Sequence, residues 1–276
     1  MLSFRTNGGR LGETINFLYG IFKFCKINNI PYSEIIVPLN YMNNPFVIDE
    51  KPQFVYKENI EMFQNIRYIF KDVNEDYFEN FVVINLNGKS DIAQLKDFYL
   101  YNNSYKDKNI LFENWWSLNK YWIIRDPKFD IKLLNYICRP EKLVKRIKKQ
   151  YKKILNGKTV AIHIRRGDYG AIVSDHLLKQ EYKDVKELIY GGKILYSIDD
   201  INKLIKKNIA DNNVLIFSDN IEWCIENFSF YKNIYFPHGK PYEDMILMSL
   251  CDNVIVNTGS FFSLVPYILS KGFKNV

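Results

Sequence analysis

The chain has 276 residues, of which 47% are hydrophobic and 25% charged, and its formal net charge is +7. These values describe a globular protein long enough for two modest domains. No apolar run reaches the roughly 18–20 residues that a membrane-spanning helix requires, and no basic-then-apolar leader precedes the first predicted strand. We therefore expect a cytoplasmic protein, or one whose leader lies outside this sequence.

The N-terminus predicts a strand, a glycine-rich turn and a helix. The strand covers residues 2–5, the turn reads Thr6-Asn7-Gly8-Gly9-Arg10-Leu11-Gly12, and helical apolar spacing runs from 13 to 26. Glycines between a strand and a helix let the backbone approach a ligand. Gly9 and Gly12 are therefore candidate ligand-binding residues, although a tight turn without a ligand explains the pattern equally well.

Residues 30–110 alternate short predicted strands, at 34–37 and 81–85, with polar loops rich in asparagine. An aromatic segment follows, from Lys108 to Trp122, with two adjacent tryptophans at its centre. These tryptophans are either core residues or a platform on which a sugar stacks, and the sequence leaves both interpretations open.

A predicted helix after Pro140 concentrates the positive charge. Its basic residues are Lys142, Lys145, Arg146, Lys148, Lys149, Lys152 and Lys153. Interleaved apolar residues supply one buried side, so a docked surface helix with a charged outer face is the favoured interpretation. Peripheral contact with an anionic membrane, through residues 141–155, is the alternative. Nucleic-acid binding is not expected, because RNA-binding aromatic motifs and helix-turn-helix punctuation are missing.

The second half of the chain predicts a doubly wound parallel α/β domain. Strands are expected at 159–164, 213–217, 233–236 and 253–257, and helices at 198–209, 219–228 and 241–251. This alternation is typical of a parallel sheet with helices on both faces. The Asn156-Gly157 turn marks the predicted boundary, so we expect domains at 1–155 and 156–276.

Cysteine and histidine usage argues against a metal site. Cys25, Cys138, Cys224 and Cys251 lack the paired spacing of zinc ligands, and the chain has only three histidines. We expect buried free thiols, no metal and no other cofactor.

The most informative segment is the strand Thr159–Ile164, which ends at Arg165-Arg166-Gly167-Asp168. In open α/β sheets, ligands bind at the carboxyl ends of the strands. The planar guanidinium of arginine matches phosphate oxygens well. The segment therefore predicts an anionic, diphosphate-bearing ligand at a sheet edge; a solvated turn is the plainer alternative.

The same segment resembles the first signature of the α-1,2-fucosyltransferases, His-x-Arg-Arg-x-Asp-Tyr, at residues 163–169. Residues 217–224 are similar to the second signature of that family, and residues 248–261 to the third. The ordered resemblance covers residues 155–268. The glycine turn departs from the family's Gly-Gly-Leu-Gly-Asn-Gln, because Arg10 is inserted and Glu13-Thr14 stand in place of Asn-Gln.

The resemblance implies two Rossmann-like α/β halves of the GT-B type, with the acceptor on the first and the nucleotide sugar on the second. It implies an inverting enzyme that moves L-fucose from GDP-fucose to a galactose-type hydroxyl of a glycan in α-1,2 linkage. Paired arginines without an Asp-x-Asp loop fit a metal-independent mechanism. Open alternatives are another linkage or nucleotide sugar, or a degenerate homologue that binds a nucleotide or glycan without turnover.

The resemblance also implies roles for the first signature. Arg165 or Arg166 contacts the β-phosphate of the donor while the other orients. His163 contacts the nucleotide or is structural. Asp168 either pairs with an arginine or acts as the base, and the ion pair is favoured because a neighbouring guanidinium lowers a carboxyl pKa.

The other two signatures supply further donor-binding candidates. Asp219 is expected to accept hydrogen bonds from guanine, to cap a helix in a capping box with Glu222, or both. Asn220 follows it in the second signature. The third signature adds Thr258, Gly259, Ser260 and Phe261, whose hydroxyl and amide groups can hold phosphate oxygens.

Overall fold

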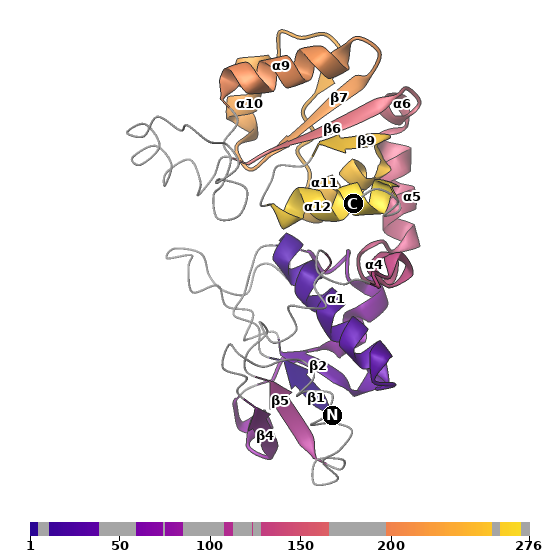
Figure 1. The fold of residues 1–276 in the computed structure, drawn as a ribbon, viewed down its shortest axis with the longest axis vertical. Helices are drawn as coiled ribbons and strands as arrows, with labels where there is room; N and C mark the ends of the chain where they lie inside the picture. The colour runs from indigo at the N-terminus through magenta and orange to yellow at the C-terminus, as the bar shows by residue number, and fades with distance from the viewer. Residues whose placement is uncertain are drawn as a thin grey trace, which may run out of the picture. The chain divides into compact units, whose positions relative to one another are not determined.

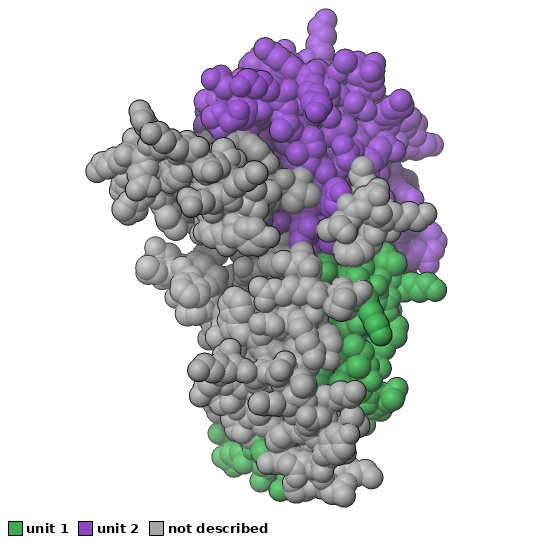
Figure 2. Space-filling model, in the orientation of Figure 1, with its two compact units in different colours: residues 1–140 green, residues 141–276 purple. Residues whose placement is uncertain are grey.

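The chain divides into two compact units, Met1–Pro140 and Glu141–Val276 (Figure 2). The computed structural model describes residues 1–4, 11–38, 59–73, 75–84, 108–112, 123, 128–165, 197–255 and 260–271. The boundary between the units precedes the one expected at 155/156, because helix α5 (Glu141–Gln150) packs within the second unit. Leu143 and Ile147 of α5 are buried, and α5 packs against α11 (Pro241–Leu250) of the second unit. The Asn156-Gly157 turn, from which the boundary was predicted, gives no information about this packing.

A five-stranded parallel sheet, in the order β3-β2-β1-β5-β4, forms the centre of the described N-terminal unit (Figure 1). Its strands are β1 (Leu2–Phe4), β2 (Ile35–Pro38), β3 (Phe70–Lys71), β4 (Phe81–Ile84) and β5 (Asn109–Phe112). The helices described with it are α1 (Leu11–Ile27) and α4 (Ile131–Cys138), with short 3-10 turns at Tyr32–Glu34, Gln64–Ile69 and Glu75–Phe78. The strands predicted at 2–5, 34–37 and 81–85 are therefore present.

Helix α1 begins at Leu11, earlier than its apolar spacing predicted. It is almost entirely buried, with Leu18 and Phe22 fully removed from solvent. Gly12 lies in its first turn, so this glycine belongs to the helix rather than to the preceding turn. Gly9 lies outside the described residues, and the ligand-binding role of both glycines stays a prediction.

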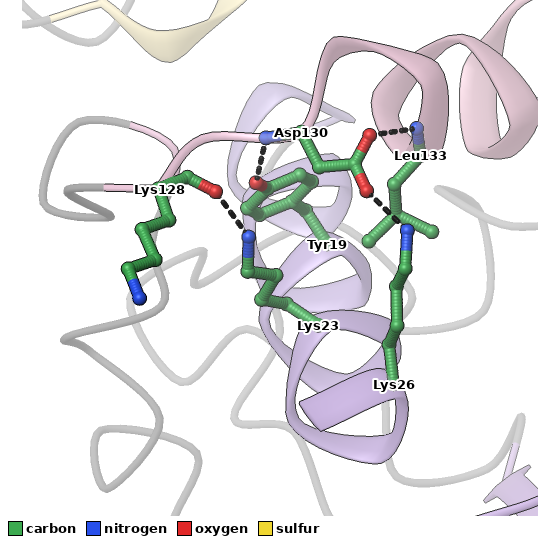
Figure 3. Close-up of polar contacts among 6 residues, drawn as sticks. All are labelled: Tyr19, Lys23, Lys26, Lys128, Asp130 and Leu133. Carbon is green, nitrogen blue, oxygen red and sulfur yellow. Dashed lines mark hydrogen bonds and ion pairs between the residues drawn. The ribbon is translucent and has the colours of Figure 1, made fainter. Parts of the chain in front are cut away.

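Polar contacts join α1 to the segment that starts α4 (Figure 3). One carboxylate oxygen of Asp130 caps α4 by accepting from the Leu133 N–H (3.0 Å), and the other pairs with Lys26 (2.6 Å). The Tyr19 hydroxyl accepts from the Asp130 N–H (2.8 Å), and the Lys23 ammonium donates to the Lys128 carbonyl. Desolvation raises the pKa of the Asp130 carboxyl, but Lys26 and the cap outweigh it and leave that pKa below its ordinary value.

The C-terminal unit contains a parallel sheet in the order β8-β7-β6-β9 (Figure 1). Its strands are β6 (Thr159–Ile164), β7 (Asn213–Ser218), β8 (Ile234–Tyr235) and β9 (Asn253–Ile255). Its helices are α5, α6 (Lys152–Leu155), α9 (Ile198–Ile209), α10 (Ile221–Phe228), α11 (Pro241–Leu250) and α12 (Phe261–Lys271). The predicted alternation of strands and helices is confirmed, and α12 adds a helix that the sequence reading omitted.

Helices cover both faces of this sheet (Figure 1). On one face, α9 and α10 bury Ile201, Ile205 and Phe228 against apolar residues of β6 and β7. On the other face, α12 packs against β9 and α11, and α11 packs against α5. The unit is therefore doubly wound, as expected for a regular β-α alternation.

The four cysteines are buried free thiols, as predicted. Within the part of the chain that the structure describes, no helix is both long enough and apolar enough to cross a membrane.

Candidate functional site

Strand order brings the first and second sequence signatures together at the carboxyl edge of the C-terminal sheet. β6 lies between β7 and β9, and Ile164 at the end of β6 pairs in register with Ser218 at the end of β7. Because the two strands are parallel, the residues that follow each of them leave the sheet at the same edge. Arg165 and Asp219 are these residues, so Arg165 stands at the end of a central strand, as expected.

Arg165 and Asp219 form an ion pair, with Nη1 2.8 Å from Oδ2. Their side chains are only 11% and 18% exposed, so both charges are largely removed from water. Such a pair is costly to break from one side, because the remaining charge stays buried without compensation. The sheet edge therefore holds a guanidinium in a defined position rather than on a mobile solvated turn.

His163 lies in β6 beside this pair and is buried, with 2% exposure. Burial, and then the charge of Arg165, lowers the pKa of its imidazole to about 4, so the ring is neutral at neutral pH. The ring centroid of Phe262 in α12 lies 5.2 Å away. Among the described residues, His163 Nδ1 has no hydrogen-bond partner. A buried ring nitrogen of this kind can serve a ligand.

The residue that caps α10 is Asn220, whose Oδ1 accepts from the Trp223 N–H (3.2 Å). The Asn220 N–H in turn donates to Ser218 Oγ (3.1 Å). The capping box expected for Asp219 and Glu222 is therefore wrong by one residue. Asp219 precedes the cap, and its carboxylate turns instead to Arg165.

The third signature is described only in part. Ser260 immediately precedes α12, and its carbonyl accepts from the Leu264 N–H (3.2 Å), while Phe261 is the first residue of that helix. The candidates outside the described residues are Arg166, Asp168, Thr258 and Gly259. Phe262 was not among the candidates predicted from the sequence, and the structure places its ring against His163.

No group of three metal-ligating side chains occurs among the described residues. The arrangement at the sheet edge offers one oriented cation and one neutral, buried imidazole. These two groups suit an anionic ligand that also carries a hydrogen-bonding group for the His163 imidazole.

Both units have a parallel α/β construction, and solved structures share it. The crystal structure of POFUT1 in complex with GDP-fucose matches with a TM-score of 0.56 and 14% identity, over 96% of this chain and 93% of that one. Fucosyltransferase NodZ from Bradyrhizobium matches with a TM-score of 0.54 and 10% identity, over 97% and 93%. These likenesses confirm the predicted fold class, two Rossmann-like halves of the GT-B type.

Residues 141–272 match the family model described as Glycosyl transferase family 11. An Escherichia coli protein, the O-antigen biosynthesis glycosyltransferase WbnK, is 31% identical over 117 residues, which are 40% of this chain. The matched segment covers 35% of that relative, so this chain matches about a third of its length. The C-terminal unit is thus similar to glycosyl transferase family 11 over almost its whole length, in agreement with the three signatures found in its sequence.

Proposed function

We propose that this protein is an inverting glycosyltransferase that moves L-fucose from GDP-fucose to a galactose-type hydroxyl of a glycan in α-1,2 linkage. The observation that carries the proposal is the oriented, largely buried guanidinium of Arg165 at the carboxyl end of β6. It lies inside the segment that matches family 11. The similar crystal structure of POFUT1 is a complex with GDP-fucose, which supports GDP-fucose as the donor of this protein.

Arg165 supplies the main electrostatic contribution in this mechanism. Breaking the bond between fucose and the β-phosphate leaves negative charge on the departing GDP, through a transition state with oxocarbenium character. A fixed guanidinium close to those oxygens stabilises that charge without a metal ion. Arg166 provides the second cation of the signature, and Asp168 orients one of the two arginines.

The remaining groups bind and orient the nucleotide. The neutral His163 ring forms a hydrogen bond with the donor through Nδ1, which has no partner among the described residues. Thr258, Gly259, Ser260 and Phe261 contribute hydroxyl and amide groups where the chain enters α12, a helix N-terminus that favours anions.

Transfer in the presence of EDTA tests this proposal. The purified protein is incubated with GDP-fucose and an acceptor that ends in galactose, and the product linkage and anomeric configuration are determined by NMR. We expect α-1,2-linked fucose, with undiminished yield in EDTA. Transfer from another nucleotide sugar only, or activity that EDTA abolishes and a metal restores, would contradict it.

A panel of acceptors separates the neighbouring alternatives. Transfer of fucose to a hydroxyl other than galactose O2 would keep the enzyme class and change the linkage. Binding of GDP without transfer or hydrolysis of GDP-fucose would identify a degenerate homologue.

The basic surface on α5 and α6 is proposed to contact an anionic membrane. Residues 141–155 contain seven basic residues and one glutamate, a balance of +6 out of the net +7 of the whole chain. Lys145 pairs with Glu141 and Arg146 with Glu243. The lysines that are exposed, with no ion pair among the described residues, are Lys142, Lys148, Lys149, Lys152 and Lys153. Exposed lysines of this density attract anionic headgroups.

Vesicle binding tests the basic surface. We expect the protein to sediment with phosphatidylglycerol vesicles and not with phosphatidylcholine vesicles, less strongly at high salt. Changing Lys142, Lys148 and Lys149 to Gln should weaken binding by roughly five-fold per lysine. The matched control changes three exposed lysines of α9, Lys203, Lys206 and Lys207, to Gln. Equal loss in both triple variants would show that only overall charge matters.

A further inference from the structure

We propose that Asp219 is a positioning residue for Arg165 and that it governs affinity for the diphosphate of the donor rather than recognition of the base. This inference rests on the proposed function, because it concerns the same nucleotide. It starts from one contact, the 2.8 Å approach of Arg165 Nη1 to Asp219 Oδ2 at the end of two neighbouring strands.

The contact follows from the strand register. Ile164 and Ser218 are paired, and each strand continues by one residue into the ion pair. The backbone after Ser218 is held as well, because the Asn220 N–H donates to Ser218 Oγ and Asn220 then caps α10. Asp219 therefore lies between the end of β7 and the start of α10, and these two rigid elements fix the position of its carboxylate.

Burial gives the pair its effect on Arg165. At 11% exposure the Arg165 side chain has lost most of its water, so its guanidinium needs a protein partner to stay at this edge. A guanidinium has five N–H donors, and a contact through Nη1 does not exhaust them. Asp219 thus fixes the Nη1 side of the guanidinium and, with it, the orientation of the whole planar group.

The same contact argues against Asp219 as the reader of guanine. Binding both guanine N1–H and N2–H calls for two carboxylate oxygens in one plane with the base. Oδ2 of Asp219 is already committed to a guanidinium at 2.8 Å. An aspartate that served the base would have to share Oδ2 between guanine and Arg165 at the moment that Arg165 must hold the departing diphosphate.

Charge alone predicts the opposite result, which makes the inference testable. Asp219 is an anion beside an anion-binding group, so its removal adds one positive charge to the site. If Asp219 acted only through its charge, Asp219→Asn would tighten the binding of every phosphate ligand. If it positions Arg165, the same change loosens the guanidinium and weakens that binding.

Calorimetric titration of Asp219→Asn with GDP, UDP and inorganic pyrophosphate tests the inference. We expect all three to bind more weakly by a similar factor, roughly ten- to a hundred-fold, with the ratio of GDP to UDP affinity unchanged. Asp219→Glu, which keeps the carboxylate on a longer side chain, should recover part of the loss. The matched control is Asp252→Asn at the opposite edge of the same sheet, where binding should not change.

Each other outcome overturns the inference. Loss of GDP affinity alone, with UDP and pyrophosphate unaffected, would assign Asp219 to the base. Tighter or unchanged binding of all three would show that Arg165 does not need its partner. Melting curves establish that the variants fold. If Asp219→Asn does not fold, the titrations are carried out with Asp219→Glu, for which a smaller loss of affinity for all three ligands is expected. Failure of the parent protein to bind any of the three ligands would count against the proposed function instead.

Discussion

The two edges of the C-terminal sheet each place an aspartate across neighbouring strands, and they use it differently. At the amino edge, Asp252 Oδ2 accepts from the N–H (2.8 Å) and the hydroxyl (2.9 Å) of Thr159, and its own N–H donates to that hydroxyl (3.1 Å). At the carboxyl edge, Asp219 holds the guanidinium of Arg165, and nearby His163 Nδ1 has no partner among the described residues.

The polar groups at the amino edge bond to one another and stabilise the fold, whereas those at the carboxyl edge include groups suited to bind a ligand. At the amino edge, the Asp252 carboxylate and the Thr159 N–H and hydroxyl satisfy one another between the starts of β6 and β9. At the carboxyl edge, a largely buried ion pair lies beside a neutral imidazole whose Nδ1 has no partner among the described residues. This matches the rule that open α/β sheets bind ligands at their carboxyl edge.

Substitution of Arg165 at the carboxyl edge should have the largest effect of the changes considered, and the effect should be a loss of transferase activity. Arg165→Lys keeps the charge but loses the planar fork, so we expect transfer to fall by roughly a hundred- to a thousand-fold, or about 3–4 kcal/mol. Initial rates at saturating donor, together with a melting curve, measure this. Near-parent rates in both Arg165→Lys and Arg166→Lys would mean that the arginine pair is structural.

Breaking the amino edge should reduce stability and leave the site intact. Asp252→Ala removes the acceptor of both Thr159 donors, and leaving such groups unpaired costs about 2 kcal/mol. Urea unfolding measures the loss, and GDP titration at a temperature where the variant is folded serves as the control. A change in GDP affinity would show that the two edges are coupled.

Two titratable groups of this unit, the partly buried Asp244 and the buried His163, should give opposite pH dependence. Burial raises the pKa of the Asp244 carboxyl from 3.8 to about 7, partly offset by the Gly239 N–H. Its contribution to stability is therefore present at low pH and lost as the pH rises through 7. The lowered pKa of His163 acts in reverse: its contribution is present above 6.5 and lost as the pH falls to about 4.

Asp244→Asn separates these contributions. The difference in unfolding free energy between variant and parent should shift in favour of the variant by up to ~1.4 kcal/mol per pH unit between pH 4 and 7. Urea unfolding at pH 5, 6 and 7 measures it. A difference that does not vary with pH would mean that Asp244 titrates as an ordinary exposed carboxyl.

The smallest effect is expected at the start of α10. Asn220→Ala removes the side chain that caps the helix, which should cost about 1 kcal/mol. Glu222→Ala is the matched control, because the structure places Glu222 outside the cap and its replacement should change stability little. A larger loss in Glu222→Ala than in Asn220→Ala, measured by thermal melting, would favour the capping box at Asp219 and Glu222 instead.

Local sequence patterns predicted the C-terminal elements well. The apolar run 159–164 became β6 with the same bounds, and the spacing over 198–209 became α9. Helix α12 was omitted, and it contains Pro266, a residue that ordinarily argues against a helix interior. The predicted single basic helix is interrupted at Tyr151, where α6 begins separately.

The site was predictable in its location and less so in its contacts. Adjacent Asp219 and Asn220 are both good capping residues, so a single sequence cannot decide which of them caps α10. Strand register decides it, by placing Asp219 opposite Arg165. The contact of Phe262 with His163 likewise joins residues about a hundred positions apart and depends on how α12 packs against the sheet.

Binding of GDP at the carboxyl edge of the C-terminal sheet can be measured through the melting temperature of the protein with GDP, UDP, ADP and CMP. Only a ligand that binds the native state raises it, by about 2.7 kcal/mol of stability at a concentration of 100 Kd. We predict the largest rise with GDP, its loss in Arg165→Lys, and its retention in Asp252→Ala from a lower starting temperature. Equal rises with all four nucleotides, or a full GDP response in Arg165→Lys, would contradict the account.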